Sequence, residues 1–360
     1  MSTFLSDSEF DKCVKCGYCK TNCPTYLSEG KETFSPRGRL ALLGLKLKNK
    51  DIYYDIDTCS KCLSCEGDCP VGLSPWKTFS DYKITTFSGK IEALLSRFMT
   101  SSAANFSIVV RSGTFLRRSD AKFPKTKTKT YSPRGNGKKV SRGGKIGFFP
   151  GCFAETTHKL WKFISKDILQ AMGYSVFIPD FICCGAPSYF AGDIEWVEKL
   201  AKKIIPMFQD TEYVLAPCDT CVWMLKIIYR EILGDKSKKF SEKVFEITDF
   251  IASRENNCSF IYEKKEADKK VTAHISCHDV SDGGRIKLLK NLGFDVQTTE
   301  FPCCGFGGTL FFKHPKVSKA LGKRLCETVK TDLLLTSSPG CALQLSSFKN
   351  VKHFLELIYI

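Results

Sequence analysis

Two cysteine quartets near the N-terminus limit what this chain can fold into. The first quartet is Cys13, Cys16, Cys19 and Cys23, followed by Pro24, and the second is Cys59, Cys62, Cys65 and Cys69, followed by Pro70. Both have the spacing C-x2-C-x2-C-x3-C-P, in which three thiolates surround one cubane iron–sulfur cluster and the fourth ligates a second cluster. This crossed pairing predicts two [4Fe-4S] clusters. Cluster 1 has the expected ligands Cys13, Cys16, Cys19 and Cys69. Cluster 2 has the expected ligands Cys59, Cys62, Cys65 and Cys23.

A zinc site or a disulfide framework is the alternative interpretation of these cysteines. A structural zinc ion takes four ligands, usually as two C-x2-C pairs, and would leave half of the eight cysteines without a role. Residues 1–9 lack the basic and apolar segments of a secretory signal, and the chain contains 19 cysteines. We therefore expect a reducing, cytoplasmic location in which the thiols hold metal.

Length and charge set further limits on domain number and partners. The chain has 360 residues, 43% of them hydrophobic, which is enough for two or three domains, and no apolar run is long enough to span a membrane. The formal charge of +16 is partly offset by the clusters, each on the order of −2. The remaining excess favours an acidic partner protein or peripheral association with an anionic membrane surface. No nucleic-acid-binding motif is present, so we expect no nucleic acid partner.

Residues 1–110 are predicted to form a helical ferredoxin domain. Ser35 is a good N-cap and Pro36 suits a first helical position, so a helix should separate the two cluster loops. Arg37 and Arg39, on this helix, are either solvated charges or contacts near a cluster, and we favour the second interpretation.

Residues 111–145 are interpreted as a basic linker. They hold Lys125, Lys127 and Lys129 in alternation, several glycines and one acidic residue, Asp120. Such a segment cannot sustain a core. A solvated tether is the simpler interpretation, and a docking strip for a partner or a lipid surface is the alternative.

The rest of the chain contains an internal repeat, which we call unit one (146–255) and unit two (256–360). Cys183-Cys184-Gly185 aligns without a gap with Cys303-Cys304-Gly305, 120 residues later. In unit one, strands are predicted at 146–149, 175–178 and 213–216, with a helix that ends at Gly173. Alternating strands and helices predict parallel βαβ units of the α/β class, with cysteines gathered at the strand ends. The expected fold is thus a helical two-cluster ferredoxin domain followed by two repeated Cys-Cys-Gly domains.

Each unit carries a second group of candidate metal ligands. Site 1, in unit one, comprises Cys152, Cys183, Cys184, Cys218 and Cys221. Site 2, in unit two, comprises Cys277, Cys303, Cys304 and Cys341. Unit two has Ser338 where unit one has Cys218, and a hydroxyl is a far poorer ligand for iron than a thiolate. We therefore expect site 1 to hold the tighter iron–sulfur cluster, cubane or non-cubane, and site 2 to bind metal weakly or to be structural.

The remaining candidates receive simpler interpretations. Cys258 and Cys326 have no counterparts in the repeat and are interpreted as structural. His158 and His278 lie near cysteines, but a satisfied surface or core histidine is favoured over a hydrogen bond to a cluster sulfur or a proton relay. The segment 305–308 lacks the full G-x-G-x-x-G pattern, so no dinucleotide site is expected.

These residues together resemble a known family. Twin quartets plus two Cys-Cys-Gly units are similar to the iron–sulfur subunits of glycolate oxidase and their relatives. Those relatives are the anaerobic glycerol-3-phosphate dehydrogenase C subunit, lactate-utilisation proteins and heterodisulfide reductase subunits. The loops at 13–19, 23–26 and 35–39 are especially similar to the glycolate oxidase type, and the resemblance covers nearly the whole chain except the linker. It implies two [4Fe-4S] clusters, an FAD-containing dehydrogenase partner, and electron transfer from the flavin to a quinone or another acceptor.

Two functions remain open at this point. The first is an electron-transfer subunit of a flavin-linked dehydrogenase for a 2-hydroxy acid or glycerol 3-phosphate. It has no catalytic residue of its own, because the sequence offers no flavin fold, paired carboxylates or nucleophile–base couple. The second is a heterodisulfide reductase-like subunit with thiol–disulfide chemistry at site 1, which the resemblance allows and Ser338 weakens. A scaffold with purely structural metal is a third, weaker interpretation.

Overall fold

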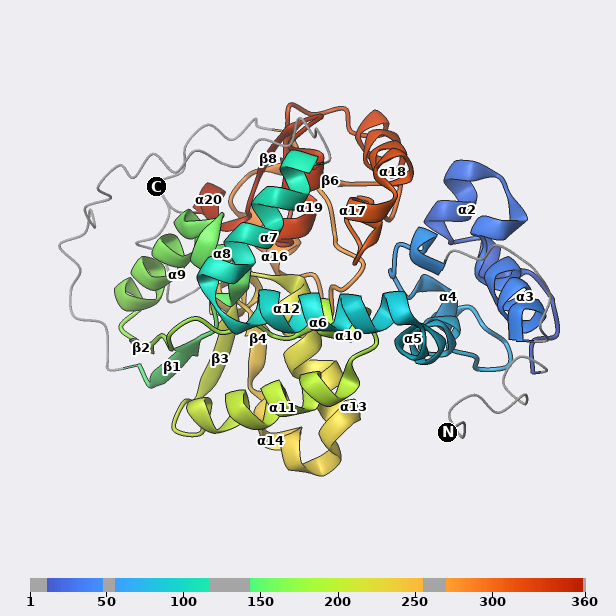
Figure 1. Cartoon of the computed structure of the whole chain (residues 1–360). Helices are drawn as coiled ribbons and strands as arrows, with labels where there is room; N and C mark the ends of the chain where they lie inside the picture. Colours follow the sequence, from blue (N-terminus) through green and yellow to red (C-terminus); the bar gives the residue numbers. More distant parts are fainter. Residues whose placement is uncertain (1–11, 48–55, 117–142, 255–269, 359–360) are drawn as a thin grey trace.

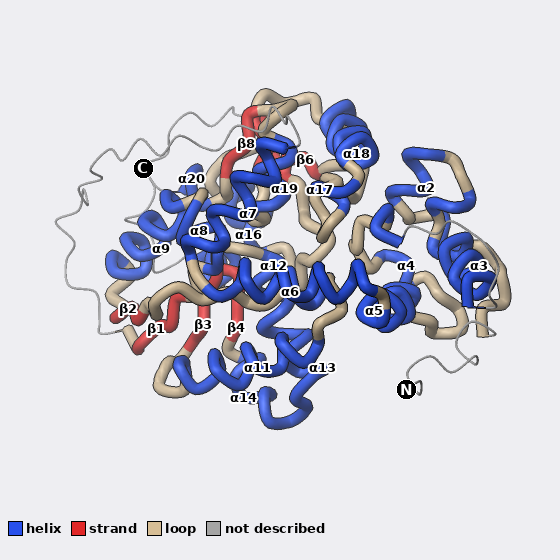
Figure 2. The backbone as a smooth tube through the Cα atoms, viewed as in Figure 1, coloured by secondary structure: helices blue, strands red, loops and turns tan. Residues whose placement is uncertain are grey.

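The computed structural model of the chain describes residues 12–47, 56–116, 143–254 and 270–358. Figure 1 shows a helical N-terminal region in blue at the right, beside unit one in green and yellow and unit two in orange and red. Figure 2 shows that the strands form two small sheets enclosed by helices. This is the predicted arrangement of a helical region followed by two α/β units.

The N-terminal region consists of short helices joined by the cysteine loops. Its helices are α2 (Pro24–Glu29), α3 (Pro36–Leu47), α4 (Ser64–Gly67) and α5 (Pro75–Thr85), with 3-10 turns at Tyr18–Lys20, Glu32–Phe34 and Ile56–Thr58. The Ser35 hydroxyl accepts from the Gly38 backbone N–H at 2.9 Å, which confirms the predicted N-cap. Leu40 and Leu43 are buried on the same core cluster as Trp76 and Phe79 and thereby join α3 to α5.

Two longer helices connect this region to the rest of the chain. They are α6 (Phe87–Ser101) and α7 (Ala103–Leu116), so residue 110 falls inside a helix. Arg97 of α6 pairs with Asp193 of unit one at 2.6 Å, and Phe106 of α7 packs edge-on against Phe153 at 5.0 Å. Both helices therefore pack on unit one. The basic residues of the predicted linker, within 117–142, lie outside the described residues.

Unit one contains a four-stranded parallel sheet in the order β2-β1-β3-β4. The strands are β1 (Lys145–Phe148), β2 (Ser175–Phe177), β3 (Tyr213–Ala216) and β4 (Val244–Glu246). The helices are α8 (Gly151–Thr156), α9 (Lys159–Ala171), α10 (Ala186–Phe190), α11 (Ile194–Ile204), α12 (Asp219–Trp223), α13 (Tyr229–Leu233), α14 (Lys238–Glu242) and α15 (Ile247–Ala252). A π-helical turn at Met224–Ile228 and 3-10 turns at Ile205–Phe208 and Gly234–Ser237 complete the unit. The three predicted strands are confirmed to within one residue, and α9 ends just before Gly173, whose φ is +85°.

Unit two repeats this sheet in the order β6-β5-β7-β8, again all parallel. The strands are β5 (Lys270–Ala273), β6 (Asp295–Thr298), β7 (Leu333–Leu335) and β8 (Asn350–Lys352). The helices are α16 (Gly284–Asn291), α17 (Leu310–Lys313), α18 (Pro315–Glu327), α19 (Pro339–Leu345) and α20 (Leu355–Ile358).

The two units pack as a pseudo-symmetric pair. The last helix of each unit contacts the first long helix of the other, α15 against α16 and α20 against α9. One buried cluster spans this contact and includes Phe148, Phe250, Leu288 and Leu355. A fully buried side chain of this kind contributes about 1.5–3 kcal/mol, so the shared core holds the two units together. Since the strands are parallel, the cysteines that follow them gather along one edge of each sheet.

Candidate metal centres

Three cysteines of the first quartet and two of the second share a small cavity. Cys13, Cys16, Cys19 and Cys69 line it, together with Arg37, and Cys65 also borders it. The loop turns through left-handed residues at Lys15 (φ +57°) and Gly17 (φ +88°). Arg37 donates to the Lys15 carbonyl at 2.8 Å and to Glu32 Oε1 at 2.8 Å, which places its charge beside the loop.

The remaining thiol of the first quartet, Cys23, lies near thiols of both quartets. Burial raises the pKa of Cys65, and the nearby thiols of Cys59, Cys62 and Cys23 raise it further. Arg39 is buried below this group and donates from Nη2 to Thr25 Oγ1 and to the Thr58 carbonyl, both at 3.0 Å. Both arginines thus lie beside cysteine loops, and their contact with a cluster stays a prediction.

The loop of the second quartet rests directly on unit two. Gly307 approaches Ser60 so closely that a Cβ at Gly307 would lie 1.7 Å from the Ser60 carbonyl oxygen. Lys61, fully buried with a left-handed φ of +58°, donates from Nζ to Thr309 Oγ1 at 2.7 Å. Gly307 and Gly308 are not part of a complete dinucleotide-binding motif. Their role is in packing, because the absence of side chains leaves room for this loop.

Charged groups anchor the same contact. Asp57 pairs with Lys83 and with Lys313 of unit two, each at 2.6 Å, and lies 3.8 Å from Lys61. Burial acts to raise the pKa of Asp57, but Lys61 and Lys83 outweigh it and hold the pKa well below its usual value. Burial lowers the pKa of Lys61 to about 8. A carboxylate shared by three lysines fixes the second quartet against unit two.

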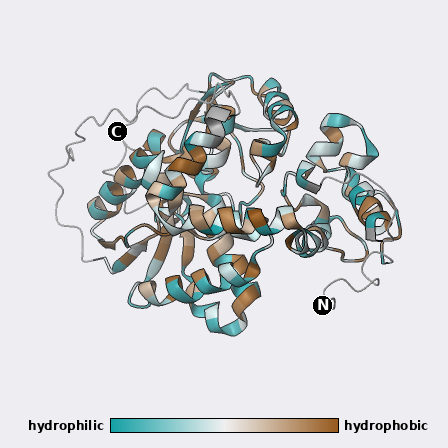
Figure 3. Ribbon diagram, viewed as in Figure 1, coloured by the Kyte–Doolittle hydropathy of each residue, from teal (hydrophilic) through white to brown (hydrophobic). Residues whose placement is uncertain are grey.

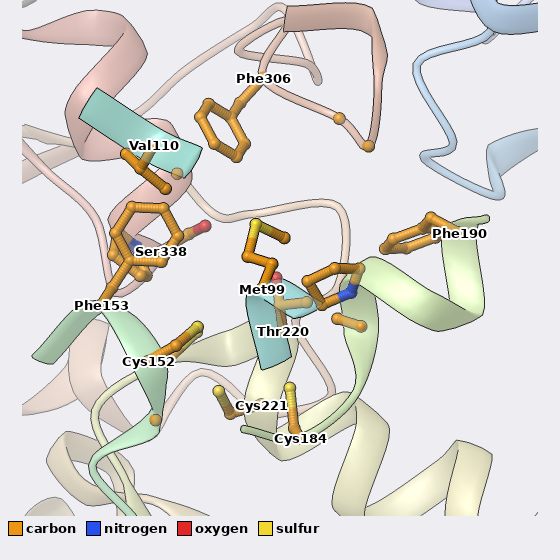
Figure 4. Close-up of a pocket in the computed structure, with 18 of the residues that line it drawn as sticks. Met99, Val110, Cys152, Phe153, Cys184, Phe190, Thr220, Cys221, Phe306 and Ser338 are labelled. Carbon is orange, nitrogen blue, oxygen red and sulfur yellow. The ribbon is translucent and has the colours of Figure 1, made fainter. Parts of the chain in front are cut away.

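Site 1 brings all five predicted thiols together at the ends of β1, β2 and β3. The pKa of Cys183 is raised first by its contact with Cys152, and that of Cys184 by its contact with Cys183. Cys221 in turn contacts Cys184 and Cys218. Figure 4 shows the sulfur atoms of Cys152, Cys184 and Cys221 on one wall of a cavity.

Site 2 brings together the four predicted thiols of unit two. The Sγ atoms of Cys304 and Cys341 are 2.8 Å apart. Burial raises the pKa of Cys303, and Cys304 and Cys62 raise it further. The Cys277 side chain is accessible only from the cavity side that it lines, so the surrounding protein still desolvates its thiol and raises its pKa, as do Cys303 and Cys62. Site 2 therefore lies next to Cys62 of the ferredoxin region.

One residue near site 2 was missed by the sequence reasoning. His274 directly follows β5, is 1% exposed, and has one ring nitrogen within 4.8 Å of the Cys304 and Cys341 sulfurs. Its signal in the sequence is its place three residues before Cys277, where unit one has Phe149 three residues before Cys152.

The two histidines considered in the sequence are satisfied buried groups, as favoured. His278 contacts Thr220 Oγ1 through Nδ1 and the Lys61 carbonyl through Nε2, both at 3.2 Å, and stacks on Trp223. Burial lowers its pKa to about 4. His158 contacts Thr157 Oγ1 at 2.8 Å, and burial lowers its pKa to about 3.

The two unpaired cysteines have different outcomes. Cys326 is buried on α18, inside an apolar cluster beside site 2, and burial raises its pKa to about 11. Cys258 lies outside the described residues. The structural interpretation of both stays a prediction.

A buried arginine, also missed, joins the cysteine loops of the two units. Arg285 of α16 donates to Asp219 at 2.7 Å, to Asp249 at 2.6 Å and to Asp279 at 2.8 Å. Asp219 follows Cys218 of site 1, and Asp279 lies two residues after Cys277 of site 2. Burial acts to lower the pKa of Arg285, but the carboxylates around it outweigh this and raise the pKa. The ion network therefore holds the two sites in a fixed relation.

One cavity of about 550 Å³ reaches both sites. Its wall includes thiols of site 1 and site 2, Ser60 of the second quartet loop, and side chains of α6 and α7. Figure 4 shows Met99 between the site 1 cysteines and Phe306, with Ser338 labelled beside Val110 and Phe153. The cavity is lined mostly by apolar and sulfur-containing side chains, so it suits an apolar molecule or a disulfide.

The donor sets fit iron–sulfur clusters. Thiolates are soft ligands that select iron–sulfur clusters, zinc and Cu(I), and each group here is crowded, as the 2.8 Å contact between Cys304 and Cys341 illustrates. A structural zinc ion would take four thiolates, whereas site 1 offers five at adjacent positions.

No helix among the described residues is long and apolar enough to cross a membrane.

Comparison with known proteins gives two domain matches. A 4Fe-4S dicluster domain matches residues 9–73, and a cysteine-rich domain matches twice, at residues 146–226 and 271–346. Lactate utilization protein A of Bacillus subtilis is 30% identical over 239 residues, covering 59% of this chain and 98% of that protein. The proteins of the same name from Bacillus licheniformis (29% identical, 56% of this chain and 90% of that one) and Shouchella clausii (27%, 55% and 84%) are also similar. The dicluster match contains both quartets, and the two cysteine-rich matches contain sites 1 and 2.

Proposed function

The chain belongs to the family of lactate utilization protein A, and from this premise we propose that it is the iron–sulfur electron-transfer subunit of a flavin-linked dehydrogenase for a lactate-type 2-hydroxy acid. The names of the relatives favour a 2-hydroxy acid over glycerol 3-phosphate. Oxidation of the hydroxy acid to the 2-oxo acid releases two electrons and two protons. We assign that step to an FAD-containing partner subunit, because this sequence has no flavin-binding fold.

The observation that carries the proposal is the contact between the second quartet loop and site 2. The clusters, when bound, take up and pass on single electrons. The ligands of cluster 1 are proposed as Cys13, Cys16, Cys19 and Cys69, and those of cluster 2 as Cys59, Cys62, Cys65 and Cys23. Cys62 lies beside Cys277 and Cys303, and Ser60 lies against Gly307. These contacts support a route from the ferredoxin region into unit two without any domain movement.

The cavity between the two sites is the proposed place of the electron acceptor. An apolar quinone ring is compatible with its volume of about 550 Å³ and with walls such as Met99, Phe106 and Phe306. A quinone takes up two electrons and two protons to become a quinol. Site 1 and site 2 both border this space, so a bound acceptor would lie beside thiol ligands from both units.

A heterodisulfide reductase-like activity is the second candidate. It is favoured by the five thiols of site 1, which border the same cavity. In this reaction a disulfide takes up two electrons and two protons and yields two thiols. The two candidates differ in the molecule that is consumed when the reduced protein is oxidised.

A surface suited to the partner subunit lies along α6. Phe87, Leu94, Leu95 and Phe98 are about half exposed or more, although they are large and apolar. Figure 3 shows apolar segments in brown along α6. Contiguous apolar surface of this kind is typical of protein interfaces. The net charge of +16 is compatible with an acidic partner, or with peripheral association at the cytoplasmic face of the membrane.

Anaerobic reduction with the partner tests the proposal. The full chain, co-purified with its flavin partner and given lactate, should show reduced [4Fe-4S] signals by electron paramagnetic resonance. Adding a quinone analogue should then reoxidise the clusters and consume the quinone. Reoxidation by a disulfide with release of two thiols, and none by quinone, would favour the second candidate.

A surface variant gives the matched control. Leu94→Glu with Phe98→Glu should weaken co-purification with the partner, whereas the iron content stays unchanged. Clusters that lactate fails to reduce in the intact complex would contradict the electron-transfer role itself.

A further inference from the structure

Unit two lacks a thiol at position 338, yet it holds a buried imidazole that unit one lacks. We propose that His274 is a metal ligand of site 2 and completes a set of four thiolates and one imidazole. This inference rests on the proposed iron–sulfur role of unit two. It assigns a ligand that neither the cysteine pattern nor the repeat predicts.

The surroundings of His274 orient it as metal-bound histidines are oriented. Its backbone N–H donates to the Leu335 carbonyl at 2.8 Å, and Nδ1 contacts Thr299 Oγ1 at 3.1 Å. Ligating histidines commonly use one ring nitrogen in such a contact, which fixes the ring and leaves the other nitrogen for the metal. With Nδ1–H donating to Thr299, the lone pair is on Nε2.

That second nitrogen is buried and faces a thiol of site 2. His274 is 1% exposed, and among the described residues Nε2 makes no hydrogen bond of good geometry, although the imidazole interacts with the Cys304 thiol. An unsatisfied buried nitrogen is unfavourable, so its retention calls for a ligand. A ring nitrogen of His274 and the sulfurs of Cys304 and Cys341 all lie within 4.8 Å of one another. That span is compatible with ligands on one metal ion or on neighbouring irons of one cluster.

Comparison of the two units shows an exchange of ligand type. His274 and Phe149 both directly follow the first strand of their unit and precede its first cysteine by three residues. Phe149 packs in the apolar core, 6.3 Å from the ring of Phe208. Unit one thus has a phenylalanine and five thiols, whereas unit two has a histidine and four.

His278, the other histidine at this cavity, does not compete for the role. Both of its nitrogens are engaged, by Thr220 and by the Lys61 carbonyl, and its ring is held between Trp223 and Phe190. It therefore provides a matched control beside the same site.

The exchange has an electrostatic consequence. With a neutral imidazole in place of a thiolate, the ligands of site 2 carry one negative charge fewer than those of site 1. Histidine ligation raises the reduction potential of iron–sulfur centres. Site 2 is also the site beside Cys62. The unit whose cysteines lie beside Cys62 is thus the one better suited to accept electrons from the ferredoxin region.

Nitrogen hyperfine coupling tests the assignment on the intact holoprotein. The chain is labelled with ¹⁵N-histidine, loaded anaerobically, and measured by pulsed electron paramagnetic resonance in its oxidised and reduced states. Wild type should show histidine nitrogen coupling, His278→Gln should retain it, and His274→Gln should lose it. His274→Cys should keep the iron of unit two, lose the nitrogen coupling and shift the potential of that centre downward.

The outcomes separate this inference from the proposed function. Coupling that survives His274→Gln, or its absence from a wild-type protein that holds iron in unit two, overturns the ligand assignment and leaves electron transfer standing. If His274→Gln fails to fold, His274→Cys and the labelled wild type still decide. Failure of lactate to reduce the clusters, with nitrogen coupling intact, instead overturns the function and leaves the ligand.

Discussion

Unit one and unit two share a sheet order and a cysteine framework, but they differ directly after the Cys-Cys-Gly motif. Unit one continues as Ala186-Pro187-Ser188 into α10, where the Ser188 hydroxyl meets that of Ser96 on α6 at 3.0 Å. Unit two has Gly307 and Gly308 at the positions of Pro187 and Ser188, and these glycines receive the second quartet loop. Two residues after a common motif thus decide which part of the N-terminal region each unit binds.

The largest expected effect is loss of iron from either unit. Comparing the two losses tests whether site 1 and site 2 hold similar amounts of iron. Cys183→Ser with Cys184→Ser should remove the iron of site 1. With His274 as an additional ligand, Cys303→Ser with Cys304→Ser should remove a similar amount from site 2. Metal and acid-labile sulfide analysis measures both. A clearly smaller loss of iron from the second variant would show that Ser338 weakens metal binding at site 2, as expected from the sequence alone.

Removal of Arg285 should break the link between the two units. Arg285→Met leaves the buried Asp219 and the partly buried Asp249 and Asp279 without their cation, and loss of one partner from a buried ion network costs about 3–5 kcal/mol. Chemical denaturation of the variant measures the change. Lys287→Met, on the exposed face of the same helix, should alter the free energy of unfolding by less than about 0.5 kcal/mol. Equal effects would show that the network does not join the units.

A methyl group at Gly307 should separate unit two from the second quartet loop. Gly307→Ala places a Cβ 1.7 Å from the Ser60 carbonyl, and such overpacking costs about 1–3 kcal/mol. Reduction of the unit two centre should slow, whereas reduction of the ferredoxin clusters should not, as rapid-freeze resonance spectra can measure. Gly44→Ala, which meets nothing within 4 Å, is the control. Unchanged kinetics at both centres would rule out this contact as the electron route.

The smallest expected effect is a difference in acid sensitivity between the units. His353 follows β8, accepts from the Leu355 backbone N–H at 3.0 Å and contacts the Pro217 carbonyl at 3.1 Å, which corresponds to a neutral ring. Burial lowers its pKa to about 3. Its contribution is complete above pH 6.5 and declines as the pH falls toward 3, because only the unfolded chain binds the proton there.

The slope of stability against pH measures this contribution. In that window one such histidine contributes about 1.4 kcal/mol per pH unit. His353→Gln should therefore flatten the dependence by about that amount in denaturation curves taken between pH 6 and pH 4. Glu246, which has the matching position in unit one and caps α15 through Thr248 and Asp249, lies 3.8 Å from His353 Nε2, and burial raises its pKa to about 8, so it contributes a slope of the opposite sign that is present in both proteins. An unchanged slope in His353→Gln would assign the acid sensitivity to other groups.

The features that the sequence predicted are local in the chain. The quartets, the Cys-Cys-Gly pairs and the strand at Tyr213–Ala216 depend on spacings of a few residues, which the covalent backbone translates directly into loops and strands. The helix from Pro36 follows likewise from its cap at Ser35. The repeat then placed the thiols of each unit together, because parallel strands end at one edge of a sheet.

The features that the sequence did not predict depend on contacts between distant segments. Arg285 reads as an ordinary surface charge until the packing of α15 on α16 brings Asp249 to it. The contact of Ser60 with Gly307 joins residues almost 250 positions apart in the sequence, and local sequence periodicity cannot predict a contact between such distant residues. His274 was accessible in principle, since aligning Cys152 with Cys277 places it opposite Phe149.

Helix α6 is a rigid connection that sets the distance between the ferredoxin region and unit one. Its 15 residues span about 22 Å, and in its middle part Glu92, bound to Lys83 and Lys313, lies five residues before Arg97, which is bound to Asp193. Helix length, and not a tether, therefore sets how far the cysteine loops stand from site 1. One residue inserted into α6 would shift everything beyond it by about 1.5 Å and rotate it by about 100°. Such an insertion disturbs the structure far more than a longer loop would. Among related chains, the length of α6 should therefore differ only by whole helical turns.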